Sequence, residues 1–228
     1  MGLLNMREKQ KLLSIYKKLY AHFGPQKWWP ADSAFEVIIG AILTQNTNWK
    51  NVEKAIFNLK KAKVLSPKSL LELKNTKLEN LLRPSGYYRQ KAKKLKVFVG
   101  HLVSHYKGRL KPMFYKPKYE LRKELLSLHG IGPETADSMI LYAAGKPTFV
   151  VDAYTRRIGN RVGLYRTNDY HEIKAYFEKN LPASLEIYKE YHALLVELAK
   201  KYCRTIPLCE KCPIKLNCFQ FPSQAAAA

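Results

Sequence analysis

Leu128-His129-Gly130-Ile131-Gly132-Pro133 is the stretch that decides the fold, because amphipathic helical patterns stand on both sides of it. Gly130 and Gly132 let the backbone turn sharply and approach another group closely. Pro133 suits the first position of the second helix, where its missing N–H costs nothing. We expect Ile131 to anchor the turn in the core. The stretch predicts a hairpin whose amides can bind a phosphate, although an ordinary turn between two helices could use the same residues.

Helical periodicity extends from this hairpin through nearly the whole chain. Strand patterns are sparse, and Thr148–Val151 is a four-residue candidate only. Asp32 or Ser33 can cap the helix that precedes residue 43, and Asn46 or Thr47 can cap the next one. The expected helices cover residues 6–22, 33–43, 47–59, 78–82, 90–106, 119–128, 133–144, 152–164, 171–180 and 185–202, and a further short helix begins at Ser66.

The charge of the chain points to a polyanionic partner. The 228 residues include 40 Lys and Arg against 18 Asp and Glu, a formal charge of +22. Because neutralising phosphates releases counterions, such an excess favours nucleic acid over a membrane surface or a role in solubility alone. No stretch approaches the roughly 18 apolar residues of a spanning helix, and the N-terminus has no signal-peptide core. We therefore expect a cytoplasmic, nucleoid-associated protein, and we read residues 225–228 as an artificial extension.

A second group of residues follows the hairpin at a fixed distance. Val151-Asp152 comes twenty residues after Gly132 and opens a basic amphipathic helix. Together, residues 128–161 resemble the helix-hairpin-helix and the Gly/Pro-rich loop with catalytic Asp of the endonuclease III, or HhH-GPD, superfamily of DNA glycosylases. Residues 43–47 (Leu-Thr-Gln-Asn-Thr) and 84–92 (with Gly86-Tyr87 and Lys91-Ala92) resemble two further segments of that superfamily.

The resemblance covers roughly residues 30–220 and implies an all-α, two-lobed fold. Residues 31–146 would form a six-helix barrel ending with the hairpin. Residues 1–30 and 147–224 would form the lobe with the catalytic Asp and an iron–sulfur cluster. Double-stranded DNA with a damaged base would lie between them, held by the amides of Gly130, Ile131 and Gly132, and the protein would act as a monomer.

Asp152 has two compatible roles. At the start of a helix its carboxylate can accept N–H groups one turn on, as any N-cap does. Breaking an N-glycosidic bond builds positive charge on the sugar, and a fixed carboxylate can stabilise that charge and orient the attacking water. The helix N-terminus lowers the pKa of such a carboxyl group, which favours these two roles over strong proton abstraction.

The resemblance also narrows the reaction. Members of the superfamily that cut the DNA backbone carry a Lys early in the second hairpin helix, whose amine forms a Schiff base with the sugar. Glu134 stands at that position here, and a carboxylate cannot form the imine. The chain is thus expected to be a monofunctional glycosylase, without efficient lyase activity. In structural terms, Glu134 also suits the first turn of a helix.

All three tryptophans fall in two places, Trp28-Trp29-Pro30 and Trp49. Trp is generally buried, so core packing is one interpretation. The other is a pocket in which a flipped base stacks, and electron-rich indoles favour the cationic ring of an N-alkylated purine. The order of Trp28-Trp29-Pro30, then residues 43–47, then Trp49 resembles the 3-methyladenine DNA glycosylase III branch of the superfamily. Gln45 stands where the superfamily places the residue that fills the hole left by the base, or serves in the cap region.

The four cysteines are Cys203, Cys209, Cys212 and Cys218. Four thiolates match a [4Fe–4S] cluster or a zinc site, but only one tight pair is present. The spacing resembles the cluster loop of the superfamily and is one residue shorter in the first interval. We expect a [4Fe–4S] cluster rather than zinc.

His101 and His105, four residues apart, could share a metal but fit a solvated basic helix better, because no third ligand is nearby.

The sequence therefore predicts a base excision repair enzyme that hydrolyses the bond to an alkylated purine such as 3-methyladenine. Within the same class, a bifunctional glycosylase/lyase on oxidised pyrimidines and a uracil or thymine mismatch glycosylase remain open. A non-enzymatic helix-hairpin-helix DNA-binding protein would explain the charge and the hairpin. It would leave Asp152, the tryptophans and the cysteines without a role.

Overall fold

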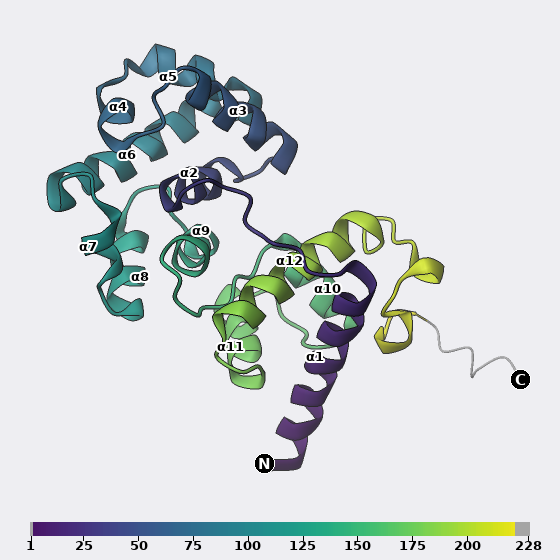
Figure 1. The fold of residues 1–228 in the computed structure, drawn as a ribbon. Helices are drawn as coiled ribbons and strands as arrows, with labels where there is room; N and C mark the ends of the chain where they lie inside the picture. The colour runs from purple at the N-terminus through teal and green to yellow at the C-terminus, as the bar shows by residue number, and fades with distance from the viewer. Residues whose placement is uncertain (1, 222–228) are drawn as a thin grey trace, which may run out of the picture. The chain divides into compact units, whose positions relative to one another are not determined.

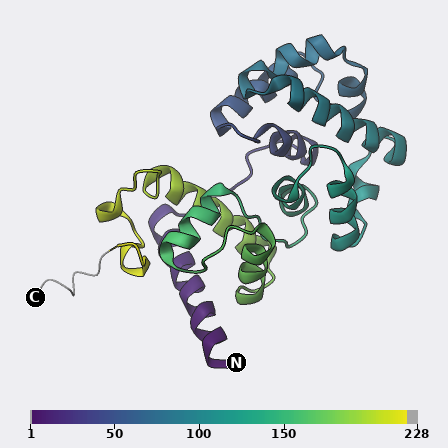
Figure 2. The ribbon, with the colours of Figure 1, turned by 180° about the vertical axis from the view of Figure 1, so that it is seen from behind.

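The chain folds into helices that form two compact units in a computed structural model, which describes residues 2–221, with side chains from residue 6 (Figures 1 and 2). The central unit comprises residues 29–146, and the terminal unit comprises residues 1–28 and 147–228. No strand occurs in the part of the chain described, so the prediction of an all-α fold is confirmed. Residues 225–228, interpreted above as an extension, lie outside the described residues.

The central unit is built around α2, whose residues from Glu36 to Leu43 are all buried. Ile38, Ile39 and Ile42 are fully buried, and Ser33 caps the helix by accepting the Glu36 amide at 3.2 Å. The helices of the unit are α2 (Ala34–Leu43), α3 (Trp49–Lys61), α4 (Pro67–Glu72), α5 (Asn75–Leu82), η1 (Arg83–Ser85), α6 (Tyr88–Tyr106), α7 (Leu110–Phe114), α8 (Lys118–Ser127), α9 (Pro133–Ser138) and the π-helical turn η2 (Met139–Ala143).

The terminal unit joins the N-terminal helix to the C-terminal third of the chain. Its helices are α1 (Gly2–Phe23), α10 (Ala153–Val162), α11 (Tyr170–Asn180), α12 (Leu185–Lys201), η3 (Cys209–Lys211) and η4 (Lys215–Asn217). The long helix α12 packs against both α1 and α10. Buried aromatic rings fill this core: Phe149 stacks on Phe177 at 4.1 Å, and the Tyr191 hydroxyl donates to the Leu12 carbonyl at 3.0 Å.

Two local candidates from the sequence, one strand and one helix cap, do not occur. Residues 148–151 are buried but form no strand, because the Phe149 amide donates to the Glu178 carboxylate at 2.9 Å instead of to a neighbouring strand. The cap of α3 is Asn48 rather than Asn46 or Thr47. Asn46 has φ of 53°, a left-handed conformation, whereas an N-cap residue needs extended backbone.

Within residues 2–221, no helix is both long enough and apolar enough to cross a bilayer.

Candidate active site

Asp152 is the N-cap of α10, as its position in the sequence predicted. Its Oδ1 accepts the Thr155 amide at 2.7 Å, and its Oδ2 lies 3.6 Å from Nε2 of His192. The Asp152 side chain is 15 % exposed and that of His192 7 %, so most of both groups is removed from water. The second contact brings together residues forty positions apart, and sequence reasoning missed it. A lone His in the otherwise apolar middle of α12 was the one available signal.

The surroundings of Asp152 have opposite effects on the pKa of its carboxyl group. Burial acts to raise the pKa of this carboxyl group, but the interactions with His192 and with Thr155 outweigh burial and hold the pKa below its usual value. The Asp152 carboxylate is therefore ionised at neutral pH. It in turn acts with burial to raise the pKa of the Tyr165 hydroxyl.

The hairpin has the shape its two glycines predicted. Gly130 has φ of 88°, and a Cβ there would lie 2.3 Å from Cγ of Lys94, so no other residue fits without displacing that side chain. Gly132 is the extended N-cap of α9, and a Cβ there would meet nothing within 4 Å. Ile131 is buried as expected, but its amide already donates to Leu128 within the turn, at 3.1 Å. Open space therefore surrounds Gly132 rather than Ile131.

Gln45 fastens the loop after α2 to the hairpin. Its Nε2 donates to the Gly130 carbonyl at 3.1 Å and to Oγ1 of Thr135 at 2.9 Å, while Lys94 donates to its Oε1. The partly buried amide is thus held against the hairpin, and filling a hole in DNA would require these hydrogen bonds to break.

An open pocket of about 510 Å³ lies beside this junction. It is lined by the loop residues 44–46 and by the hairpin, and Lys94 and Glu134 supply its charged side chains. The ammonium of Lys94 favours an anion in this pocket, and the carboxylate of Glu134 limits where that anion can sit.

The tryptophans separate into two settings. Trp29 packs edge-on against Trp49, with ring centroids 5.2 Å apart, and against Tyr142 at 5.3 Å. Trp28 belongs to the terminal unit, where the ammonium of Lys200 lies 5.4 Å from its ring. Tyr142, from the π-helical turn, is an aromatic neighbour that the sequence did not indicate. Pro30 is exposed beside this group.

The four cysteines come together at one pocket. Cys203, Cys209, Cys212 and Cys218 line it with the apolar side chains of α10 and α12, and none forms a disulfide. Burial raises the pKa of the Cys212 thiol, and the three other thiols raise it further, so the four sulfurs are close enough to interact. Yet no three His, Cys, Asp or Glu side chains among the described residues converge tightly enough for a single metal ion.

The basic face of α10 turns toward this cysteine loop. Arg161 donates to the carbonyls of Arg204 at 2.6 Å and Thr205 at 3.0 Å, and it approaches Sγ of Cys203 at 3.5 Å. The Arg157 Nε donates to the Cys203 carbonyl at 3.0 Å. These two guanidinium groups hold the loop in place, a role that the amphipathic pattern alone did not indicate.

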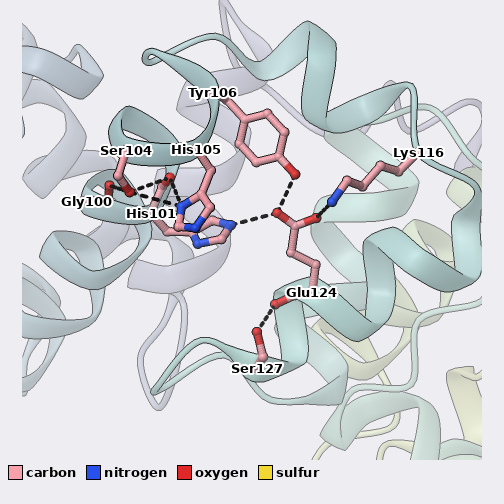
Figure 3. Close-up of polar contacts among 8 residues, drawn as sticks. All are labelled: Gly100, His101, Ser104, His105, Tyr106, Lys116, Glu124 and Ser127. Carbon is pink, nitrogen blue, oxygen red and sulfur yellow. Dashed lines mark hydrogen bonds and ion pairs between the residues drawn. The ribbon is translucent and has the colours of Figure 1, made fainter.

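The two histidines of α6 belong to a separate polar cluster (Figure 3). The His101 ring lies 2.7 Å from the Glu124 carboxylate. The same carboxylate accepts the Tyr106 hydroxyl at 2.5 Å and the Lys116 ammonium at 2.7 Å. The ring of His105 stacks on His101 at 4.3 Å and is exposed. The expectation of a solvated face is correct for His105. It is wrong for His101, because Glu124 of α8 contacts the His101 ring.

Comparison with known proteins identifies the family. Residues 39–183 match the HhH-GPD superfamily of base excision DNA repair proteins. A provisionally named DNA repair glycosylase of Methanocaldococcus jannaschii is 51 % identical over 92 % of this chain and 96 % of its own length. Endonuclease III of Thermotoga maritima is 33 % identical over 81 % of this chain and 82 % of its own.

Among solved structures, a Helicobacter pylori 3-methyladenine DNA glycosylase bound to 1,N6-ethenoadenine superimposes with a TM-score of 0.75. It is 30 % identical, and the match covers 83 % of this chain and 97 % of that one. With the hairpin and the Asp-capped helix in place, these matches show that the chain belongs to the HhH-GPD superfamily and is a DNA glycosylase of base excision repair.

Proposed function

We propose that this glycosylase hydrolyses the N-glycosidic bond of alkylated purines such as 3-methyladenine and leaves the DNA backbone intact. The observation that carries the chemical part is the Asp152 carboxylate, mostly buried and held ionised at the start of α10. Similarity at 30 % identity to a 3-methyladenine DNA glycosylase supports the class of base. As part of the proposal, residues 31–146 are the barrel lobe, and residues 1–30 and 147–224 are the catalytic lobe.

The reaction needs a negative charge fixed near the sugar. As the bond from C1′ to the base nitrogen breaks, its electron pair leaves with the base and positive charge develops on C1′ and the ring oxygen. The Asp152 carboxylate stabilises this charge and orients the water whose oxygen bonds to C1′. The water proton is released, and the neutral base and an abasic site are the products. A carboxylate with a lowered pKa suits charge stabilisation better than proton abstraction.

Glu134 supports the absence of strand cleavage. It occupies the first turn of α9, where backbone-cutting relatives are expected to carry the amine that forms a Schiff base. Its carboxylate cannot attack C1′ to form an imine, so the reaction would stop at the abasic site.

DNA binding would use the hairpin and the charge of the chain. The backbone of Gly130 and Gly132, with Lys94 beside them, borders an open pocket in which a phosphate can sit. Ile131 then serves as the apolar anchor of the turn. The formal charge of +22 supplies the attraction to the polyanion and predicts that affinity falls steeply with salt.

For the damaged base we propose the aromatic group of Trp29 and Trp49, with Pro30 at its edge. A cationic purine stacked on an indole gains cation–π attraction, about 0.5–2 kcal/mol in proteins. We propose Gln45 as the residue that enters the space the base leaves, provided its hydrogen bonds to the hairpin exchange for DNA contacts.

We propose that the cysteine pocket holds a [4Fe–4S] cluster rather than zinc, because the spacing of the four cysteines contains only one tight pair. Four thiols that line one pocket without forming a disulfide are the donor set that such a cluster takes. Bound there, it would tie the loop to α10 and α12 as a structural group and supply no step of the hydrolysis.

The test measures base release from methylated DNA and from duplexes with a single defined lesion. The panel contains 3-methyladenine, 7-methylguanine, 1,N6-ethenoadenine, uracil, thymine opposite guanine, and thymine glycol. Asp152→Asn is the decisive variant, because Asn caps a helix as well as Asp and leaves the fold intact. Asp169→Asn, at the exposed cap of α11, is the matched control.

Release of alkylpurines that is lost in Asp152→Asn and retained in Asp169→Asn would support the proposal. Release of pyrimidines alone would overturn the alkylpurine assignment, and full activity of Asp152→Asn would overturn its catalytic role. A covalent DNA adduct trapped by borohydride would refute the monofunctional reaction.

A further inference from the structure

The two oxygens of the Asp152 carboxylate have different partners. Oδ1 accepts the Thr155 amide at 2.7 Å and so performs the helix capping. Oδ2 points to Nε2 of His192, 3.6 Å away on α12. Since both contacts lie within the terminal unit, they fix the rotation of the carboxylate at two points independently of DNA.

Capping alone does not require the second contact. Asp169 caps α11 by accepting the amides of His171 and Glu172 on a single oxygen, each at 2.8 Å. That cap is exposed and needs no imidazole, because water solvates its charge. Asp152 is mostly buried, and a carboxylate removed from water requires a further donor or positive charge to stay ionised.

We infer that His192 is the positioning residue of the active site: from α12 it holds the Oδ2 atom of Asp152 in place and keeps the carboxylate ionised. This role rests on the proposed function of Asp152 and deepens it. The Asp152 Oδ2 to His192 Nε2 distance of 3.6 Å is that of an ion pair and exceeds that of a direct hydrogen bond.

The groups that face the pair come from several elements. Tyr165, in the segment after α10, interacts with the charge of Asp152, and Arg156 of α10 interacts with Tyr165. Burial and the Asp152 charge raise the pKa of Tyr165 to a value that keeps its hydroxyl neutral through the working range. His192 is the basic group on the Oδ2 side of the carboxylate, so its loss leaves burial unopposed there and the pKa of Asp152 rises.

The experiment compares His192→Leu, which removes the donor, with His192→Gln, which keeps an N–H donor without the ring. His171→Gln is the matched control, because it changes an exposed histidine of the same unit. Single-turnover release of 7-methylguanine and 1,N6-ethenoadenine is followed from pH 4.5 to 9. Affinity for an uncleaved duplex and the thermal midpoint are measured in parallel.

For wild type and His171→Gln we expect no loss of activity down to pH 4.5, because the pKa of Asp152 is held below its usual value and its acidic limb falls below this range. For His192→Leu that limb should move upward by about one to three pH units, the effect of losing a partner close to a carboxylate. At any pH on the limb, the rate should fall about tenfold for each pH unit by which the limb has moved. His192→Gln should move the limb less, and DNA affinity should stay unchanged.

An equal rate loss at every pH in both variants would overturn the inference, because it would indicate a structural role. An unchanged profile would overturn it as well. If His192→Leu does not fold, the profile of His192→Gln decides. No release by the wild type from any lesion in the panel would instead refute the proposed function, so the two failures are distinguishable.

Discussion

The substitution Gly159→Ala, on the helix that Asp152 caps, changes stability in two opposite ways. Higher helix propensity stabilises the protein, and the clash of the new methyl group with its neighbours destabilises it. Gly159 lies in α10 with the ring of Tyr165 laid directly across it. A Cβ at this position would lie 2.0 Å from the Tyr165 hydroxyl oxygen and 2.1 Å from Cζ. The same hydroxyl donates to the Thr155 carbonyl at 2.8 Å, so the ring cannot retreat without losing that hydrogen bond.

The magnitude follows from opposing contributions. Replacing Gly by Ala inside a helix normally stabilises a protein by about 0.5–1 kcal/mol. Overpacking of this kind costs about 1–3 kcal/mol, and the lost hydrogen bond from Tyr165 about 1 kcal/mol more. The net expectation for Gly159→Ala is a destabilisation of about 1–3 kcal/mol. Because α10 carries Asp152, base release should fall as well.

The assay is denaturant unfolding followed by far-ultraviolet circular dichroism. Gly100→Ala is the control, because it also lies inside a helix, where its Cβ would meet only Leu71 Cδ1 at 3.9 Å. That variant should gain about 0.5–1 kcal/mol. In a Tyr165→Ala background, Gly159→Ala should become neutral or stabilising. Stabilisation of the otherwise wild-type protein by Gly159→Ala would refute the packing argument.

Three further outcomes are expected. Burial, with a contribution from nearby Lys94, lowers the pKa of Lys91 to about 8, so between pH 8 and 10.5 the unfolded chain holds this proton and the native state does not. In urea titrations, the free energy of unfolding of the wild type relative to Lys91→Met should therefore rise with pH across this range. Arg122→Met should cost about 3–5 kcal/mol, because Arg122 binds the fully buried carboxylate of Asp137 at 2.9 Å, and adding Asp137→Leu should restore much of the loss in the same unfolding assay. Gly40→Ala would bring a Cβ within 3.2 Å of the Trp29 indole nitrogen, so the tryptophan fluorescence should shift and alkylpurine release should slow; no change in either would contradict the pocket.

What the sequence determined by itself is local. Gly130 and Pro133 predicted the hairpin because positive φ and a missing N–H are properties of single residues. Asp152 was expected at a helix start because capping involves only the next turn. The hydrophobic period of 3.6 residues located the helices, although Asn48 rather than its neighbours caps α3, since the choice depends on backbone angles.

What only the tertiary structure decided are the contacts between distant residues. His192 meets Asp152 because α12 packs on α10, and no pattern within either helix encodes that pairing. Trp28 and Trp29 are adjacent in the chain, yet they belong to different units. Arg161 binds the cysteine loop, a contact that the amphipathic pattern of its helix did not indicate. The physical reason is common to all three: periodicity states which face of a helix is buried, but side-chain packing chooses what that face meets.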